Sequence, residues 1–120
     1  MLPKIYRLKK RSAFAATYKI GNSYHKNGVT LFCGKYKPES ETVIPTKIGF
    51  VVSKKIHKRA VKRNRIKRLM RESVRLYIKK QDNNLDTKYL SLIFVASAKL
   101  LDKDFDFINK QIIDLLGIIE

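Results

Sequence analysis

One segment of the sequence constrains the fold more than any other, and it runs from about residue 59 to residue 80. Its apolar residues recur at intervals of three and four, which is the spacing of one face of an α-helix. They are Ile66, Leu69, Met70, Val74, Tyr77 and Ile78. At about 3.6 residues per turn, a polar and basic set falls on the opposite face. That set is Asn64, Arg68, Arg71 and Arg75, with Lys67 on its flank. We therefore expect a long helix that packs one face on a core.

Shorter periodic segments on both sides of this helix predict an α+β fold. A first helix is expected from Ser12, as its N-cap, to about Lys19, with Gly21 as its C-terminal stop. Residues 29–37 and 47–53 alternate as β-strands do, and we expect these two strands to pair antiparallel. A short extra strand is also expected near residues 22–25.

The C-terminal part completes the predicted architecture. After a polar break at residues 81–84, the apolar run 89–96 predicts a buried strand. Asp102 is expected to cap a final amphipathic helix. No repeat, linker or domain boundary interrupts the pattern. The prediction is therefore a single domain over residues 1–120, a two-layer α+β sandwich with a small sheet and the order α-β-β(β)-α-β-α.

The charge of the chain is strongly one-sided. Lys and Arg number 27 against 10 Asp and Glu, which leaves a net charge of +17 on 120 residues. Ten of the basic residues lie between Lys54 and Arg71, where no acidic residue occurs. A charged helix face is usually only solvated, but like charges one helical turn apart repel each other and destabilise a helix. The pattern therefore favours a polyanion, and nucleic-acid phosphate first, as the partner.

Other residues exclude several classes of protein. Cys33 is the single cysteine, so no internal disulfide is possible and a reducing compartment is expected. No stretch approaches the roughly 20 apolar residues of a membrane span, so we expect a cytoplasmic protein without a membrane partner. With only His25 and His57 as histidines, a self-sufficient nuclease is not expected.

Three acidic residues near the C-terminus imitate the start of a calcium loop. Asp102, Asp104 and Asp106 have the right spacing, but Phe107 replaces the glycine of the turn and Ile113 replaces the bidentate glutamate. Helix capping explains the three aspartates better, so we expect no calcium site.

The basic run also carries a specific signature. It reads Ser53-Lys54-Lys55-Ile56, followed by the continuous segment Arg59-Ala60-Val61-Lys62-Arg63-Asn64-Arg65-Ile66-Lys67-Arg68-Leu69-Met70-Arg71. Upstream, Leu8-Lys9-Lys10-Arg11 precedes Phe14 and Tyr18. Together these segments resemble the bacterial ribonuclease P protein subunit, and the resemblance extends over nearly the whole chain. One departure is His57, which stands where family members often have glycine and concerns the loop before the Arg-rich helix.

The resemblance implies a function in tRNA maturation. The family's proteins bind the catalytic RNA of ribonuclease P and help it to recognise precursor tRNA, from which the holoenzyme removes the 5′ leader. The chain would thus belong to an endoribonuclease whose catalysis resides in the RNA subunit, with magnesium bound mainly by RNA. No protein partner is required. The resemblance also implies a left-handed β-α-β crossover through the Arg-rich helix, which fold rules alone would not predict.

The family's functional residues carry over onto two sets of positions. The set implied to bind the catalytic RNA is Arg63, Asn64, Arg65, Lys67, Arg68 and Arg71. The set implied to bind the 5′ leader in a cleft is Phe14, Tyr18, Phe32, Val51, Ser53 and Lys55. From the residues alone, Asn64 has two readings, a contact to RNA or a local backbone bond. Phe14 and Phe32 likewise are either core residues or a stacking platform for single-stranded RNA.

Two other functional classes, structural RNA-binding proteins and membrane-surface proteins, share some features of this sequence. Ribosomal and other structural RNA-binding proteins share the small size, high pI and α+β architecture of this chain. A membrane-surface protein would need a basic helix with an exposed apolar face, whereas here that face is required for the core.

Overall fold

The computed structural model describes residues 4–37, 45–81 and 89–119. The elements in these ranges follow the order η1 (Lys4–Tyr6), α1 (Arg11–Ile20), β1 (Asn22–Lys26), β2 (Val29–Cys33), β3 (Lys47–Val52), α2 (Ala60–Lys80), β4 (Ser91–Ala96), η2 (Ala98–Leu100) and α3 (Phe105–Ile119), where η marks a short 3-10 turn. The predicted α+β order is confirmed, including the extra strand near residues 22–25. The polar break predicted at residues 81–84 lies largely outside the described residues.

The four strands form one sheet in the order β1-β2-β4-β3. β1 and β4 both pair antiparallel with β2, whereas β3 pairs parallel with β4. The prediction that the strands at 29–37 and 47–53 pair with each other is therefore wrong, because β4 lies between them. The most apolar segment of the chain takes this central position, where both of its faces are covered. The parallel pair also needs a long crossover, which α2 provides.

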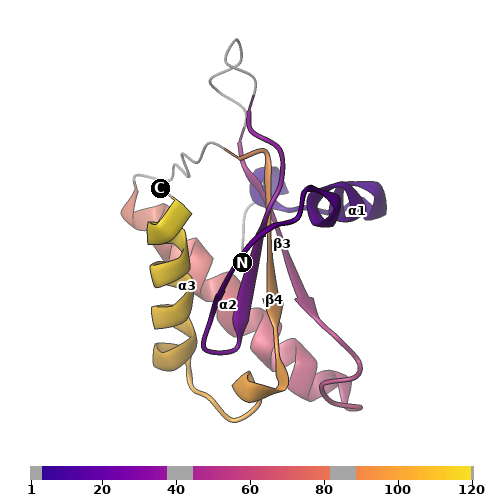
Figure 1. Cartoon of the computed structure of the whole chain (residues 1–120). Coiled ribbons are helices and arrows are strands. Elements are labelled where there is room, and N and C mark those ends of the chain that lie inside the picture. Colours follow the sequence, from indigo (N-terminus) through magenta and orange to yellow (C-terminus); the bar gives the residue numbers. More distant parts are fainter. Residues whose placement is uncertain (1–3, 38–44, 82–88, 120) are drawn as a thin grey trace.

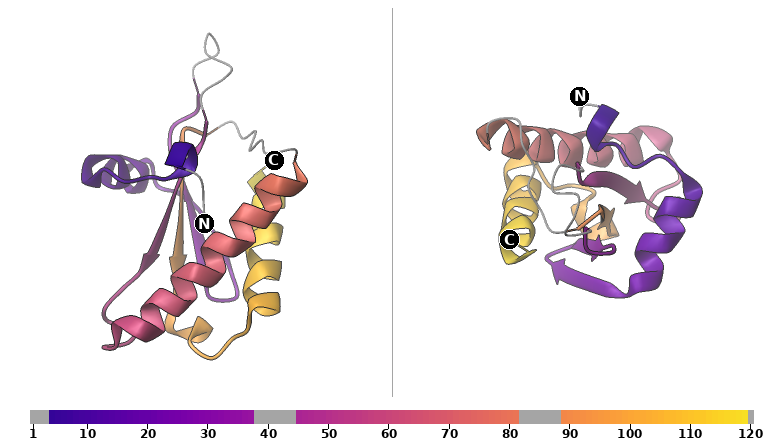
Figure 2. Two further views of the ribbon diagram at one scale, coloured as in Figure 1. Left: turned by 180° about the vertical axis from the view of Figure 1, so that it is seen from behind. Right: turned by 90° about the horizontal axis from the view of Figure 1, so that it is seen from above.

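The helices cover the two faces of the sheet unequally. Figure 1 shows the sheet nearly edge-on, with α3 on one side and α1 on the other, and Figure 2 shows α2 crossing the sheet on the side of α3. With β4 adjacent to β3, this placement makes the β3-α2-β4 crossover left-handed. About 98% of such crossovers are right-handed. The family resemblance implied this exception correctly.

The core lies between the sheet and the pair α2 and α3. The predicted stripe of α2 is confirmed, because Ile66, Met70 and Val74 are completely buried and Leu69 and Tyr77 pack at the margin. Burying one such side chain stabilises the fold by about 1.5–3 kcal/mol. α3 contributes Ile108, Ile112, Leu115 and Leu116, all of them fully buried. One face of α2 is thus committed to the core and the other is left for solvent or a partner.

The predicted caps at the helix starts are wrong, although the first helix stops where predicted. α1 begins at Arg11, so Ser12 lies inside the helix and Lys10 occupies the N-cap without a side-chain bond. Its last residue is Ile20, and the C-cap residue Gly21 has a φ of 79°, which lies in the left-handed region. For α3 the cap is Asp104, whose Oδ1 accepts the Phe107 N–H at 3.0 Å. Asp102 instead lies in the turn that follows η2, which delays the start of the helix.

The hairpin between β1 and β2 has a two-residue turn. Asn27 and Gly28 both have positive φ, at 45° and 96°, and Lys26 pairs directly with Val29. Asn-Gly favours this kind of turn because neither residue is strongly strained in the left-handed region. The tight turn fixes the register of β1 on β2 and so the positions of their side chains on each face.

Across the described ranges, no helix combines the length and the apolar character that would be needed to cross a membrane.

Candidate nucleic-acid interface

The outward side of α2 carries a surface that we call the cationic face, formed by Asn64, Lys67, Arg68 and Arg71. Asn64, Arg68 and Arg71 are exposed and Lys67 is half-buried. Among the described residues, none forms a hydrogen bond or an ion pair with the side chain of Asn64 or Arg68. Within the described residues, the amide of Asn64 thus makes no local backbone bond, which favours the alternative that it contacts RNA. The face offers donors in several directions to an anionic partner.

Two other arginines of the signature bind the protein's own backbone. Nη1 of Arg63 donates to the carbonyls of His57 at 2.8 Å and of Lys58 at 3.0 Å. Nη2 of Arg65 donates to the carbonyl of Lys103, in the segment before α3, at 3.0 Å. Arg65 Nη1 is buried and has no hydrogen-bond partner among the described residues. These two side chains therefore hold the segments on either side of the cationic face as well as adding charge to it.

The loop before α2 accommodates His57 without strain. Nδ1 of His57 accepts the Arg59 N–H at 3.0 Å, and its carbonyl is one of the two bound by Arg63. In the described part of the chain, Asn27 is the one non-glycine residue with positive φ, so His57 does not adopt a backbone that requires glycine. A glycine at this position is therefore not needed for the loop conformation seen here.

One acidic side chain lies near the cationic face, and an arginine engages it. Arg75 Nε donates to Glu72 Oε2 at 3.0 Å, and Arg75 Nη2 contacts Oε1 at 2.5 Å. The hydrogen bond from Arg75 is the main cause that lowers the pKa of the Glu72 carboxyl. Arg75, which the sequence placed on the same face, is thus partly neutralised. Among the described residues, no carboxylate forms an ion pair with Arg68 or Arg71.

A second surface, which we call the α1–sheet surface, lies on the opposite face of the sheet. The register places Phe32, Ile93 and Gly49 in one row across β2, β4 and β3. An ideal Cβ on Gly49 would come within 2.5 Å of two ring atoms of Phe14, so the Phe14 ring lies directly on the backbone of β3. The Tyr18 ring meets Phe32 edge-on, with 4.9 Å between centroids. Phe14 and Tyr18 thus cover this row from α1.

The next row of the same face is not covered by α1. It comprises Thr30, Val95 and Val51, which are all half-buried, so their side chains remain partly open to solvent. Tyr18 borders this region with 38% of its surface exposed, and burial raises the pKa of its phenol. The arrangement provides a short apolar floor with aromatic edges, which suits unpaired bases better than a folded duplex.

A known protein family matches almost the full length of the chain. The family model described as Ribonuclease P matches residues 2–120. The chain belongs to the ribonuclease P protein family. The ribonuclease P protein component of Fusobacterium nucleatum is 40% identical over 105 residues, covering 88% of this chain and 85% of that protein. That of Clostridium kluyveri is 36% identical over 115 residues, covering 93% and 92%.

Solved structures of ribonuclease P proteins have the same fold. The protein from Staphylococcus aureus aligns with a TM-score of 0.73 at 27% identity and covers 94% of each chain. The protein from Thermotoga maritima aligns with a TM-score of 0.72 at 23% identity, covering 95% of this chain and 97% of that one. At 23% identity, the likeness to the Thermotoga maritima protein concerns the fold alone. Together they confirm the predicted architecture of a ribonuclease P protein.

The residues that the ribonuclease P resemblance singled out fall in two separate places. Those of the Arg-rich signature all lie on α2, although Arg63 and Arg65 are turned toward backbone carbonyls. Phe14, Tyr18, Phe32 and Val51 come together on the α1–sheet surface. Ser53 and Lys55 follow the end of β3 and are exposed, and Ser53 Oγ accepts the Lys55 N–H at 3.2 Å.

Sequence reasoning missed several residues of the α1–sheet surface. Thr30 and Val95 lie beside Val51, and His25 pairs with Thr30, with 2.9 Å between Nδ1 of His25 and Oγ1 of Thr30. Alternation along the strand predicts on which face of the sheet Thr30 lies, but not which residues lie beside it on the neighbouring strands. Only the strand order places His25, Thr30, Val95 and Val51 in one line. The Asn-Gly turn that sets the register of β1 was the one signal in the sequence for His25.

Metal ions in proteins are held by clustered His, Cys, Asp or Glu side chains. Within residues 4–37, 45–81 and 89–119, no group of three or more His, Cys, Asp or Glu side chains is arranged to hold a metal ion.

Proposed function

We propose that this chain is the protein subunit of ribonuclease P that binds the catalytic RNA through the cationic face of α2 and the 5′ leader of precursor tRNA through the α1–sheet surface. It would assist endonucleolytic removal of the leader as a single RNA-binding domain. The observation that carries the proposal is the presence of two unlike surfaces, a cationic one on the outward side of α2 and an aromatic one on the sheet face that α1 covers. One protein of this design can hold two RNA segments at once.

The cationic face suits the backbone of a folded RNA. Arginine offers planar, bidentate donors to phosphate, and Asn64 adds a neutral group that can donate to and accept from a 2′-hydroxyl or a base edge. Each phosphate that such a face neutralises releases counterions, so binding should weaken steeply as salt is raised. Arg63 and Arg65 would support this contact by fixing the loop before α2 and the segment before α3.

The α1–sheet surface suits a single strand. Phe14 and Tyr18 present aromatic rings beside the half-buried row of Thr30, Val95 and Val51, and base stacking on such rings contributes about 1–3 kcal/mol per base. Ser53 and Lys55, at the end of β3, add a hydroxyl and a cation for the leader backbone. This surface would read the presence of a leader rather than a particular base sequence.

We assign the chemical step to the RNA subunit. The groups on the two surfaces bind and orient, and the cleavage chemistry, including the magnesium that the holoenzyme requires, is placed with the RNA. The protein would raise the affinity for substrate and offset repulsion between two polyanions.

Reconstitution tests this function. The purified chain is added to a bacterial ribonuclease P RNA at low magnesium, and cleavage of precursor tRNA at its mature 5′ end is measured. We expect a clear rise in rate. A double variant Lys99→Ala/Lys110→Ala, which removes two exposed cations outside both surfaces, is the matched control and should activate as the wild type does. A folded chain that leaves the rate unchanged would point instead to a structural RNA-binding protein.

A further inference from the structure

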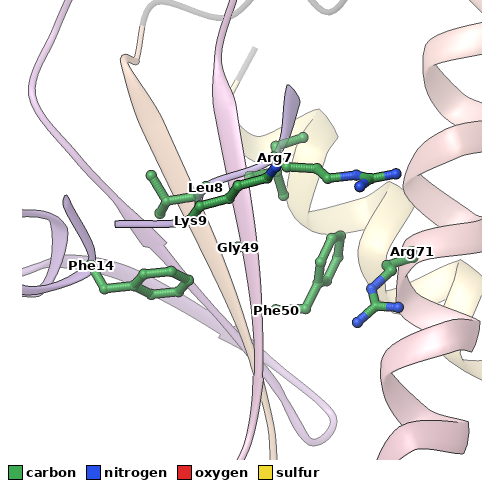
Figure 3. Close-up of a pocket in the computed structure, with 8 residues that line it drawn as sticks. Arg7, Leu8, Lys9, Phe14, Gly49, Phe50 and Arg71 are labelled. Carbon is green, nitrogen blue, oxygen red and sulfur yellow. The ribbon is translucent and has the colours of Figure 1, made fainter. Parts of the chain in front are cut away.

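A pocket of about 280 Å³ lies at the free edge of β3, between the N-terminal segment and α2 (Figure 3). We call it the edge pocket, and its lining includes Arg7, Lys9, Phe14, Gly49, Phe50 and Arg71. It lies between the two surfaces described above and shares residues with both. Phe14 connects it to the α1–sheet surface and Arg71 connects it to the cationic face of α2.

The backbone of β3 is open in this pocket. The N-terminal segment touches the outer edge of β3 at one point, where the Leu8 N–H donates to the Ile48 carbonyl at 2.9 Å. Peptide groups alternate in direction along a strand, so the N–H and C=O of Phe50 point to the same outer edge as those of Ile48. Within the described residues no backbone group pairs with Phe50 on that side. The pocket therefore contains one backbone donor and one backbone acceptor next to each other.

The lining also includes the guanidinium groups of Arg7 and Arg71 and the aromatic ring of Phe50. Figure 3 shows Arg7 reaching toward α2 and Arg71 reaching back from α2, with the Phe50 ring between them. Phe50 is backed by Phe94, with 5.8 Å between ring centroids and 13° between ring planes, so its position is fixed by the core. Among the residues that the structure describes, no carboxylate lines the edge pocket, and the nearby Glu72 is engaged by Arg75.

We propose that the edge pocket binds one nucleotide of single-stranded RNA. The phosphate would lie between Arg7 and Arg71, and the base would lie against Phe50 with its polar edge on the peptide group of β3. Guanidinium pairs match phosphate geometry, and aromatic faces accept any base. The volume is close to the lower limit of ligand pockets, roughly 300 Å³, which suits one nucleotide and not a duplex.

This inference rests on the proposed function and deepens it, because the edge pocket joins the two RNA surfaces. A strand that leaves the α1–sheet surface past Phe14 passes through the pocket before it reaches Arg71. The nucleotide could come from the precursor's leader or from an unpaired segment of the catalytic RNA. Both sources offer the same chemistry.

A titration followed by NMR tests the pocket directly. Isotope-labelled protein is titrated with short oligouridine and oligoadenine RNAs, and the amide signals of Gly49 and Phe50 are followed. We expect both signals to shift, and Arg7→Ala to weaken binding about tenfold. Lys110→Ala, which removes an exposed cation of α3, should bind as the wild type does. Shifts that leave Phe50 unmoved, or an Arg7→Ala variant with wild-type affinity, would overturn the proposal.

A second variant protects the test against misfolding. Phe50→Leu keeps an apolar side chain against Phe94 but removes the aromatic face, and thermal unfolding shows whether each variant is folded. If Phe50→Leu does not fold, the Phe50 amide shift in the wild type and the affinity of Arg7→Ala still decide the matter.

Three RNA ligands identify the source of the nucleotide and separate this proposal from the function on which it rests. Affinities of Arg7→Ala and wild type are compared for precursor tRNA in the holoenzyme, for tRNA without a leader, and for the catalytic RNA alone. A loss confined to the leader-bearing precursor assigns the nucleotide to the leader, and a loss with the catalytic RNA alone assigns it to that RNA. No loss in any arm overturns the pocket while reconstitution can still succeed. Oligonucleotide binding at Phe50 without activation would support the pocket and contradict the proposed function.

Discussion

The cationic face of α2 and the α1–sheet surface differ in how many elements build them. Asn64, Lys67, Arg68 and Arg71 all come from one helix, so their relative positions follow from helical spacing alone. The α1–sheet surface combines side chains from α1, β2, β4 and β3, and its geometry depends on the strand order. The first surface can therefore change by single side chains without loss of shape. The second is sensitive to any change that moves one element against another.

The two surfaces also differ in the forces they offer to RNA. Charge dominates on α2, and its effect extends roughly 8–10 Å into solvent at physiological salt. Contact dominates on the α1–sheet surface, where Phe14, Tyr18 and Phe32 supply rings and apolar area. Binding to α2 should therefore be strongly salt-dependent, whereas leader binding should depend on surface shape.

The largest expected effect is on the cationic face. Lys67→Ala/Arg68→Ala would remove two of the phosphate contacts that we propose, and it should weaken binding of the catalytic RNA by about 3 kcal/mol, roughly a hundredfold. The slope of log affinity against log salt should fall by about 1.4–1.8. Filter binding over a salt series measures both quantities. The control Lys99→Ala/Lys110→Ala removes the same charge elsewhere, and an equal loss there would mean that net charge alone binds the RNA.

Gly49→Ala should have a smaller effect, and this effect should be on binding of the leader and not on binding of the catalytic RNA. The new Cβ would come within 2.5 Å of Cε1 and Cζ of Phe14, so the ring must move off β3. Since a stacked base contributes about 1–3 kcal/mol, affinity for the leader should fall about tenfold while binding of the catalytic RNA stays unchanged. Competition between precursors with and without a leader measures this.

Gly117→Ala is the matched control for that experiment. Gly117 lies in α3 with no atom within 4 Å of an added Cβ, so alanine should raise stability by about 0.5–1 kcal/mol through helix propensity. Leader binding should not change. If Gly117→Ala weakened leader binding as much as Gly49→Ala does, the effect could not be assigned to Phe14.

Arg65→Lys separates the two roles of the arginine signature. Lysine keeps the positive charge but loses the planar donor that reaches the Lys103 carbonyl, so the free energy of unfolding should fall by about 1 kcal/mol. Binding of the catalytic RNA should change by less than about threefold if the anchoring role of Arg65 is its main one. Denaturant unfolding and RNA titration on the same samples decide the point, and a large loss of RNA affinity in a stable variant would assign Arg65 to the RNA.

The smallest effect is expected for Glu72→Gln. The Arg75–Glu72 pair is more than a third exposed and therefore strongly screened by solvent, so its loss should change stability very little. Because the pKa of Glu72 is lowered in the folded state, the pair stabilises the protein above the unfolded pKa and that contribution disappears as pH falls through the folded pKa. Binding of catalytic RNA should rise slightly, since one negative charge beside the cationic face is gone. Weaker binding would show that Glu72 positions Arg75 for RNA.

The two surfaces were not equally predictable from sequence. Helical periodicity is local, so the buried and exposed sides of α2 followed directly from the spacing of Ile66, Met70 and Arg68. Strand pairing is not local, and alternation in β2 and β3 gave their faces but not the insertion of β4 between them. His25 and Val95 were missed for that reason. The hydrogen bonds from Arg63 and Arg65 to backbone carbonyls could not be predicted either. They depend on how residues 57–58 and residue 103 lie against α2 in the folded chain.

The caps show a similar limit. Ser12 and Asp102 had suitable side chains, but each helix begins where the preceding turn closes, and that closure depends on packing. The left-handed crossover was not predictable from periodicity at all, and it came from the family resemblance.

If two separate surfaces bind two RNA segments, a substitution on one surface should leave the function of the other intact. Arg68→Ala and Phe14→Ala are each reconstituted with the catalytic RNA, after thermal unfolding has shown that both are folded. Affinity for the catalytic RNA and the affinity gained from a 5′ leader are then measured for each. We predict that Arg68→Ala loses the first with a flatter salt dependence and that Phe14→Ala loses the second. Equal losses in both assays for both variants would contradict the account.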